Sequence, residues 1–176
     1  MSHLNIEMKA RCTNPQRIRA LLQERQAEFC GLDVQRDTYF RVPHGRLKLR
    51  EGQIENNLIY YERDNVSAPK EALVSLLPTQ PGSPLKAMLS QALGVLVVVE
   101  KQREIYFIEN VKFHIDEVTG LGAFVEIEAI DTEGTIGKDK LVTQCQEFLR
   151  LFELPVHDLV ATSYSDLLLA QHEELV

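Results

Sequence analysis

The sequence feature that most constrains this chain is the alternation of residue types between Val111 and Ala129, on both sides of a turn with two glycines. Successive side chains of a strand point to opposite faces, so this alternation predicts an antiparallel hairpin with one apolar face and one ionisable face. The ionisable residues of the two arms are Lys112, His114, Asp116, Glu126 and Glu128.

Three of these residues are carboxylates, and they converge if the polar faces of the two arms coincide. Asp116, Glu126 and Glu128 would then repel one another unless a cation neutralised them. Oxygen ligands of this kind suit a hard divalent metal, so the hairpin predicts a site for Mg²⁺ or Mn²⁺. The alternative is a solvated outer face of an antiparallel sheet, and the hairpin by itself is compatible with both.

Three further segments repeat the pattern, and two of them carry basic rows. Residues 4–12 alternate polar with apolar side chains, residues 46–50 align three basic residues on one face, and residues 95–108 place two basic residues on an otherwise apolar face. Like charges on a buried face are costly unless anions balance them, so the basic rows predict either an anion-binding interior or a solvent-facing strip. The residues of these rows are Asn5, Glu7, Lys9, Arg11, Arg46, Lys48, Arg50, Lys101 and Arg103.

About eight strands with ionisable faces predict an α+β fold built on an eight-stranded antiparallel closed β-barrel, with helices packed outside against the apolar faces. Capping signals and helical periodicity predict a first helix that begins near Asn14 and ends at Gly31. Three more helices are expected at about 85–93, at about 135–152 and after Ser163. The chain has 176 residues, so we expect a single domain over residues 1–176.

Composition narrows the classes of partner and the compartment. Nineteen basic and 26 acidic residues give a net charge of −7, which argues against general binding to nucleic acid or to an acidic membrane. No apolar run approaches the roughly 20 residues of a membrane span, and the start of the chain lacks the order of a signal peptide. The three cysteines have no metal-type spacing and are expected to be reduced, so the expected location is cytoplasmic.

Acidic and basic side chains that face the same interior would be explained by a ligand that consists of a triphosphate and a divalent cation. Carboxylates would hold the metal and basic residues would clamp the phosphates, with arginine offering paired donors. Neutralising phosphate charge from two sides is the main requirement of phosphoryl transfer. The candidate metal ligands are Glu7, Asp116, Glu126 and Glu128, and the candidate phosphate-binding residues are Lys9, Lys48, Arg50, Lys101 and Arg103.

These residues also carry a family resemblance. Asn5-x-Glu7-x-Lys9 resembles the Glu-x-Glu-x-Lys signature of the CYTH superfamily, also called triphosphate tunnel metalloenzymes. The supporting stretches, in the family's order and covering nearly the whole chain, are Asp37-Thr-Tyr-Phe40, Leu47-Lys-Leu-Arg50, Lys101-Gln-Arg103, His114-Ile-Asp-Glu-Val-Thr-Gly-Leu-Gly122 and Phe124-Val-Glu-Ile-Glu128.

The resemblance implies an eight-stranded tunnel, dependence on a divalent metal, and triphosphate substrates. By position it implies metal ligation by Glu7, Glu126 and Glu128, with Asp116 nearby, and contact with the phosphates by the five basic residues named above. Among these, Lys9 and Arg103 are the candidate catalytic residues. The superfamily includes class IV adenylyl cyclases, thiamine triphosphatases and inorganic triphosphatases.

Two positions depart from the family pattern. Asn5 replaces the first signature glutamate and removes a negative charge, and the strand Tyr60–Arg63 offers Glu62 or Arg63 where many relatives place a lysine. The alternation does not show which face of that strand is interior.

The leading hypothesis is a metal-dependent enzyme that hydrolyses inorganic triphosphate or an organic or nucleoside triphosphate, as a monomer or homodimer. One alternative is a class IV adenylyl cyclase that converts ATP to cyclic AMP and pyrophosphate, which needs a pocket for the nucleoside. Another is a non-catalytic binder of polyphosphate or a nucleotide, which Asn5 keeps open. A barrel for an apolar ligand is disfavoured by Lys101 and Arg103.

Overall fold

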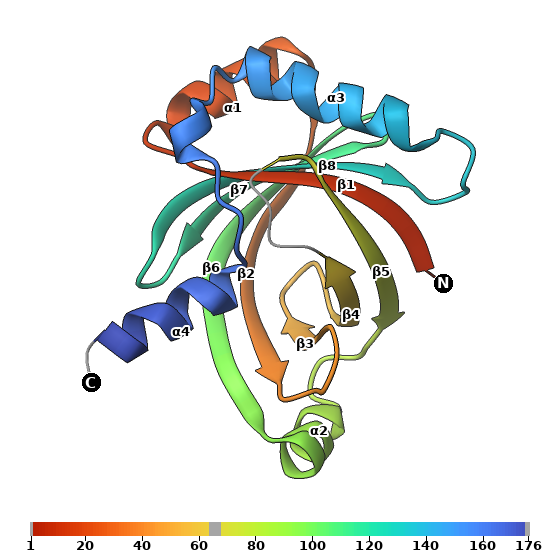
Figure 1. Ribbon diagram of the computed structural model, residues 1–176, viewed down its shortest axis with the longest axis vertical. Coiled ribbons are helices and arrows are strands. Elements are labelled where there is room, and N and C mark those ends of the chain that lie inside the picture. The colour runs from red at the N-terminus through yellow and green to blue at the C-terminus, as the bar shows by residue number, and fades with distance from the viewer. Residues whose placement is uncertain (1, 64–67, 175–176) are drawn as a thin grey trace.

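The computed structural model describes residues 2–63 and 68–174 of the chain, and it has the predicted α+β composition (Figure 1). None of the helices in these ranges combines the length and apolar content needed to cross a bilayer. The elements in chain order are β1 (Ser2–Arg11), α1 (Pro15–Glu24), β2 (Glu28–Phe40), β3 (Arg46–Glu51), β4 (Asn57–Arg63), β5 (Lys70–Pro78), α2 (Leu85–Leu93), β6 (Val95–Ile108), β7 (Val111–Val118), β8 (Gly122–Asp131), α3 (Lys138–Leu151), a 3₁₀ turn (Val156–Asp158) and α4 (Tyr164–Glu174).

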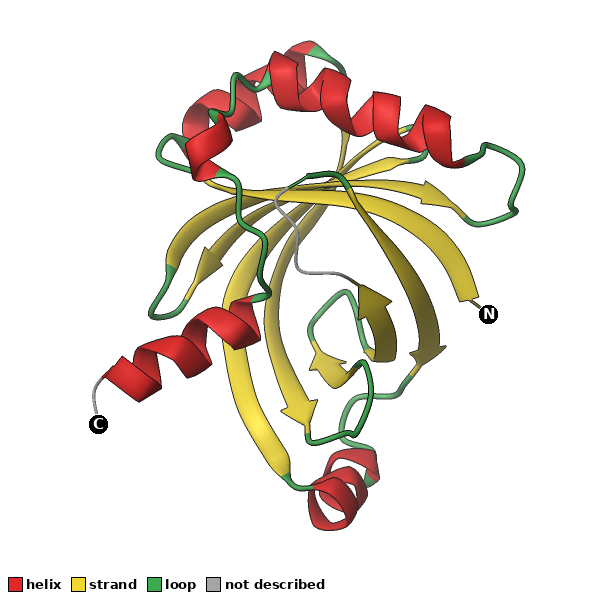
Figure 2. Ribbon diagram, viewed as in Figure 1, coloured by secondary structure: helices red, strands yellow, loops and turns green. Residues whose placement is uncertain are grey.

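The eight strands form one antiparallel sheet that returns on itself. They pair in the order β1-β5-β4-β3-β2-β6-β7-β8, and β8 pairs again with β1. Figure 2 shows the strands curving around a common interior, with the helices outside or at the ends. Every strand therefore has one face toward this interior, which is the arrangement that the alternating sequence predicts.

The outer face of β1, β7 and β8 is covered by α1 and α3, which lie over the same side of the sheet (Figure 1). Apolar side chains from the strands, among them Ile6, Phe113 and Ile127, pack there against Leu22 of α1 and Leu141 of α3. All five are at most 1% exposed, and burying each such side chain contributes roughly 1.5–3 kcal/mol. The main apolar core thus lies outside the barrel, as predicted.

The outer face of β2 and β6 is different, because apolar residues there remain exposed. Leu32 and Val34 on β2 are 48% and 51% exposed, and Val98 on β6 is 39% exposed. The expectation that helices cover the outward apolar faces is therefore correct for β1, β7 and β8 but wrong at these positions. The two covering helices both pack on the opposite part of the ring.

The first helix is shorter than predicted. It ends at Glu24, and Gln26 has a positive φ of 56° that turns the chain back toward the sheet. Strand β2 begins at Glu28, so Phe29 belongs to the strand, where its ring lies 4.8 Å from that of Tyr106. Pairing with β6 extends over these residues, and this ladder outweighs the helical periodicity that assigns Phe29 to the helix.

Inside the barrel, an apolar cluster occupies the end where α4 begins. Tyr164, the first residue of α4, packs there against inward side chains of four strands. Its ring meets that of Phe124 edge-on, with centroids 4.9 Å apart. The charged residues lie beyond this cluster, along the interior. The cluster members are Tyr39, Val97, Val99, Val118, Phe124 and Tyr164.

Candidate functional site

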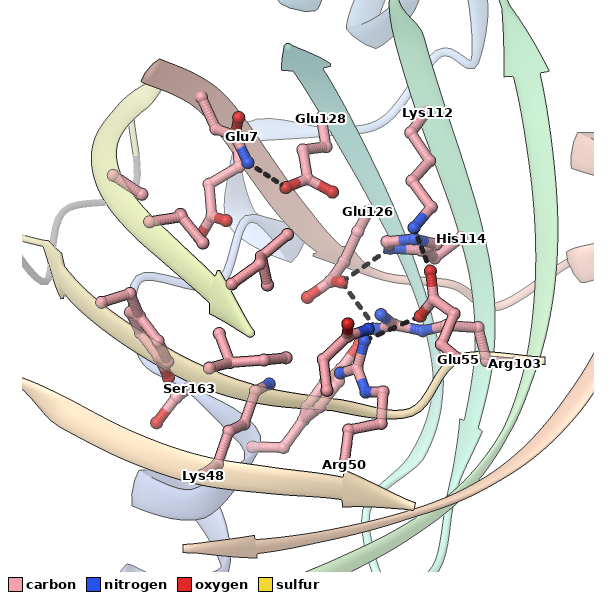
Figure 3. Close-up of a pocket in the computed structure, with 18 of the residues that line it drawn as sticks. Glu7, Lys48, Arg50, Glu55, Arg103, Lys112, His114, Glu126, Glu128 and Ser163 are labelled. Carbon is pink, nitrogen blue, oxygen red and sulfur yellow. Dashed lines mark hydrogen bonds and ion pairs between the residues drawn. The ribbon is translucent and has the colours of Figure 1, made fainter. Parts of the chain in front are cut away.

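A cavity of about 170 Å³ lies inside the barrel, many times the roughly 10–15 Å³ that one buried water requires (Figure 3). Six basic and four acidic side chains line it, so the predicted rows from separate segments meet in one space. The charged lining residues are Glu7, Lys9, Lys48, Arg50, Glu55, Lys101, Arg103, Lys112, Glu126 and Glu128. Eight of these ten are residues that the sequence pattern singled out for metal or phosphate binding.

The pairing of β1 with β8 places the two acidic signatures side by side. Glu7 lies directly opposite Glu128, and Lys9 lies opposite Glu126. Side chains opposite each other on antiparallel strands have Cβ atoms about 4.5–5.5 Å apart, close enough for shared ligands or ion pairs. The Lys9 Nζ lies 3.1 Å from Glu126 Oε1. This register places the Glu-x-Lys motif of β1 directly beside the Glu-x-Glu motif of β8.

Arg103 is held in a bidentate ion pair with Asp116. Its Nε donates to Asp116 Oδ1 at 2.7 Å, and its Nη2 donates to Asp116 Oδ2 at 2.5 Å and to Glu126 Oε2 at 2.8 Å. The Tyr164 hydroxyl also donates to Asp116 Oδ2 at 2.8 Å. Burial raises the pKa of Asp116, but the charge of Arg103 outweighs it and keeps that pKa below its usual range.

Asp116 therefore has a different position from the one its pattern suggested. It is 0% exposed and lies behind Arg103, whereas the other three candidate metal ligands, Glu7, Glu126 and Glu128, line the cavity. We assign Asp116 to fixing the guanidinium of Arg103 and do not retain it as a metal ligand. The alternation of side chains predicts that Asp116 faces the interior, but it does not predict whether the carboxylate reaches the cavity or is covered by another side chain.

A second buried carboxylate, Asp37, holds three of the predicted phosphate-binding residues. It accepts two hydrogen bonds from Arg50 at 2.8 Å each, one from Lys101 at 2.9 Å and one from Lys48 at 3.0 Å. Burial raises the pKa of Asp37, but the charges of Arg50 and Lys101 outweigh it and hold that pKa well below its usual range. Burial lowers the pKa of Lys101 to about 7, against the opposing effect of Asp37.

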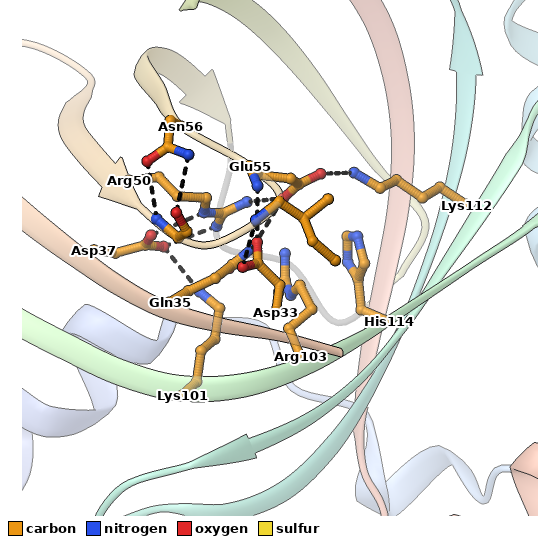
Figure 4. Close-up of polar contacts among 12 residues, drawn as sticks. Asp33, Gln35, Asp37, Arg50, Glu55, Asn56, Lys101, Arg103, Lys112 and His114 are labelled. Carbon is orange, nitrogen blue, oxygen red and sulfur yellow. Dashed lines mark hydrogen bonds and ion pairs between the residues drawn. The ribbon is translucent and has the colours of Figure 1, made fainter. Parts of the chain in front are cut away.

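The loop between β3 and β4 brings in a carboxylate that the sequence pattern did not indicate (Figure 4). Glu55 accepts hydrogen bonds from Arg50 at 2.9 Å and from Gln35 at 3.0 Å, and it pairs with Lys112. The loop is anchored by buried Asp33, whose carboxylate accepts from the backbone N–H groups of residues 53, 54 and 55. The charges of Arg50 and Lys112 outweigh burial and lower the pKa of Glu55.

Asn5 and His114 each carry a buried polar atom with no hydrogen-bond partner in the described structure. The amide nitrogen of Asn5 donates to Glu128, and its Oδ1 has no partner. His114 Nδ1 lies 3.1 Å from Glu126 Oε2, and its Nε2 has no partner. An amide oxygen is a ligand for hard cations, so Asn5 Oδ1 adds an oxygen donor beside Glu7 and Glu128.

The oxygen donors of Asn5, Glu7 and Glu128 fit Mg²⁺ or Mn²⁺, because carboxylate and amide oxygens suit these ions. Among residues 2–63 and 68–174, no three His, Cys, Asp or Glu side chains are gathered closely enough to make a metal site by themselves. Two carboxylates on opposite strand positions together with the amide oxygen of Asn5 remain as the available donor set.

Several site residues were outside the predicted set. The alternation predicted that Lys112 and His114 share the ionisable face of their strand, but it assigned them no function. Glu55 lies in a loop, where side chains do not alternate and the sequence pattern cannot predict their direction. The undecided strand β4 presents Tyr61 to the cavity, and Glu62 is exposed. The side chain of Arg63 lies outside the described residues.

The geometry agrees with comparisons to known proteins. The family model of the CYTH domain matches residues 3–164. This chain belongs to the CYTH domain family. A similar protein is one from Methanocaldococcus jannaschii that is named as a candidate adenylate cyclase. It is 24% identical over 176 residues, and the match covers 93% of this chain and 98% of that protein.

Solved structures share the CYTH fold over almost the whole chain. A Pyrococcus horikoshii protein has a TM-score of 0.76 at 24% identity and covers 92% of this chain and 98% of its own. A candidate adenylate cyclase of Vibrio parahaemolyticus has a TM-score of 0.73 at 19% identity, with coverages of 96% and 99%. A Hippeastrum protein has a TM-score of 0.60 at 14% identity, with coverages of 97% and 96%. At these identities the likeness concerns the fold.

Proposed function

We propose that this CYTH protein is a divalent-metal-dependent enzyme that binds a triphosphate in the barrel cavity and hydrolyses it. One observation carries the proposal: six basic and four acidic side chains from separate strands and one loop surround a single cavity. Basic groups would neutralise the phosphate oxygens, and carboxylates would hold the divalent metal. A polyanion with its cation is the ligand class that requires both sets at once.

In this proposal the chain's own residues position and neutralise the phosphates. Arg103 is fixed by Asp116 and presents its guanidinium to the cavity, and Lys9 and Arg103 both form ion pairs with Glu126. Donors that are fixed before the reaction stabilise developing charge without reorganising, which is the main source of catalysis in phosphoryl transfer. The metal would be held by Glu7, Glu128 and the amide oxygen of Asn5, with the predicted ligand Glu126 next to them and paired with Lys9 and Arg103. When bound, it supplies Lewis-acid polarisation of phosphate oxygens.

Hydrolysis is the first choice of reaction because it requires only a water near the terminal phosphate. The Hippeastrum protein is described as a candidate adenylyl cyclase with a dominant triphosphatase activity, which supports hydrolysis for a protein of this fold. The test is to incubate purified protein with tripolyphosphate and with ATP, with and without Mg²⁺ or Mn²⁺, and to quantify phosphate. Phosphate release that depends on metal is expected.

Cyclisation of ATP is the second candidate, and the names of the Methanocaldococcus and Vibrio relatives favour it. It requires the ribose 3′-hydroxyl to be brought to the α-phosphate, so its products are cyclic AMP and pyrophosphate. Formation of these two products from ATP would replace hydrolysis as the assignment. Binding of tripolyphosphate or ATP without any product would instead make the protein a non-catalytic binder.

A further inference from the structure

Among the side chains that the structure describes, six from β4 and β5 line the cavity and none of them is charged; one is Asn57, and the other five are apolar or aromatic. Tyr61 pairs with Val74, and Ile59 pairs with Leu76, as direct cross-strand neighbours. Ala72 completes the surface, and Ile59, Tyr61, Ala72 and Val74 form a small apolar cluster apart from the core under α1 and α3. This group of five residues, the β4–β5 strip, faces the same cavity as the ten charged residues.

The strip is bordered by the residues that would hold phosphate and metal. On one side Lys48 lies opposite Ile59 in the β3–β4 ladder, and on the other side Asn5 lies opposite Ala72 in the β1–β5 ladder. In the strand order, β4 and β5 stand across the ring from β6 and β7, which carry three basic residues and His114 toward the cavity. The cavity therefore has a charged side and an apolar side.

This division bears on the kind of triphosphate that fits. Tripolyphosphate is charged along its whole length, and placing charged oxygens against apolar side chains removes water without returning hydrogen bonds. An organic triphosphate has an uncharged end that gains from burial on such a surface, while polar groups elsewhere fix its orientation. Leu76, the most exposed member of the strip at 36%, leaves this end of the surface accessible.

We infer that the β4–β5 strip is a subsite for the apolar or aromatic part of an organic triphosphate, and that the enzyme prefers such a substrate to inorganic tripolyphosphate. The inference rests on the proposed function, since it assigns the phosphates to the charged side. Val74 and Ile59 then act as specificity-determining residues, because they contact the organic group and take no part in the reaction.

The test compares tripolyphosphate, methyl triphosphate and ATP, which share the phosphate chain and differ in the organic end. kcat/KM is measured with Mg²⁺, and Kd is measured by calorimetry without metal. The wild type is expected to favour ATP over tripolyphosphate at least tenfold, with methyl triphosphate between them. Val74→Lys should lower this ratio at least tenfold, because it places a cation on the strip. The milder Val74→Thr should lower the ratio in the same direction.

The matched control is Leu73→Lys, on the same strand but on the outer face, where Leu73 is 58% exposed. It should leave the ratio unchanged, and thermal unfolding of each variant establishes that it is folded. Preference of the wild type for tripolyphosphate, or a ratio that neither Val74 variant changes, would overturn the inference while leaving hydrolysis intact. Neither binding nor turnover of any compound would instead overturn the proposed function.

Discussion

Two pairs of carboxylates balance the positive charge inside the barrel, and they differ in depth. Asp37 and Asp116 are at most 1% exposed, and each forms a bidentate ion pair with the guanidinium of an arginine. The side chains of Glu55 and Glu126 are 17% and 19% exposed and line the cavity. The deep pair fixes the basic groups in place, while the shallow pair occupies positions at which an anion or a cation could exchange.

The deep pair should dominate stability. Asp37→Asn removes a buried charge and leaves Arg50, Lys101 and Lys48 without their shared anion, so we expect a loss of about 3–5 kcal/mol in the free energy of unfolding. Glu55→Gln, at the cavity surface, should cost only about 1 kcal/mol. Denaturant unfolding of both variants measures the difference, and equal losses would remove the distinction between the two pairs.

The next largest effect concerns Glu126 and Glu128, the two carboxylates of β8 that line the cavity. Glu128→Gln keeps the shape of the side chain but removes a charge that would bind metal, so metal-dependent turnover should fall at least about 100-fold, or about 2.7 kcal/mol. Glu126→Gln should lower turnover as well, although it also disturbs Lys9 and Arg103. The control Glu100→Gln lies outside the barrel, pairs with Arg36 and should have no effect. Unchanged turnover in both inner variants would refute the metal site.

A smaller effect should separate Glu55 from the carboxylates that are proposed to bind metal. Glu55 pairs with Arg50 and Lys112, so it competes with a bound phosphate for these cations. Glu55→Gln should therefore strengthen the binding of tripolyphosphate about tenfold, or about 1.4 kcal/mol, as measured by calorimetry. Glu51→Gln, which removes a surface partner of Lys86, is the control. Weaker binding by Glu55→Gln would show that the loop carboxylate supports the ligand.

The smallest expected effect is on pH dependence. Burial lowers the pKa of Lys101 to about 7, although neighbouring Asp37 opposes the shift. Lysine is charged below its pKa, so raising the pH through 7 removes a cation that would contact a bound phosphate. Affinity for tripolyphosphate should therefore fall about threefold between pH 6 and pH 8.5. Lys101→Arg stays charged over this range and should abolish this part of the pH dependence. An identical profile in both proteins would contradict the role.

Sequence alternation was sufficient to place the charged strands, and it failed where alternation is absent or ambiguous. Lys101 and Arg103 were predicted to face inward because they interrupt an otherwise apolar row, and β6 has that orientation. Strand β4 alternates between two mixed faces, so the pattern did not show that Tyr61 lines the cavity. Glu55 belongs to a loop whose course depends on hydrogen bonds to distant Asp33. Neither Glu55 nor the depth of Asp116 has a periodic signal.

The most direct test of the central claim is a crystal structure with tripolyphosphate and Mn²⁺, in which anomalous scattering locates the metal. We predict phosphates inside the barrel, in contact with Lys9 and Arg103, and Mn²⁺ beside Glu7 and Glu128. A triphosphate bound on the outer surface, with the barrel interior filled only by water, would contradict the account.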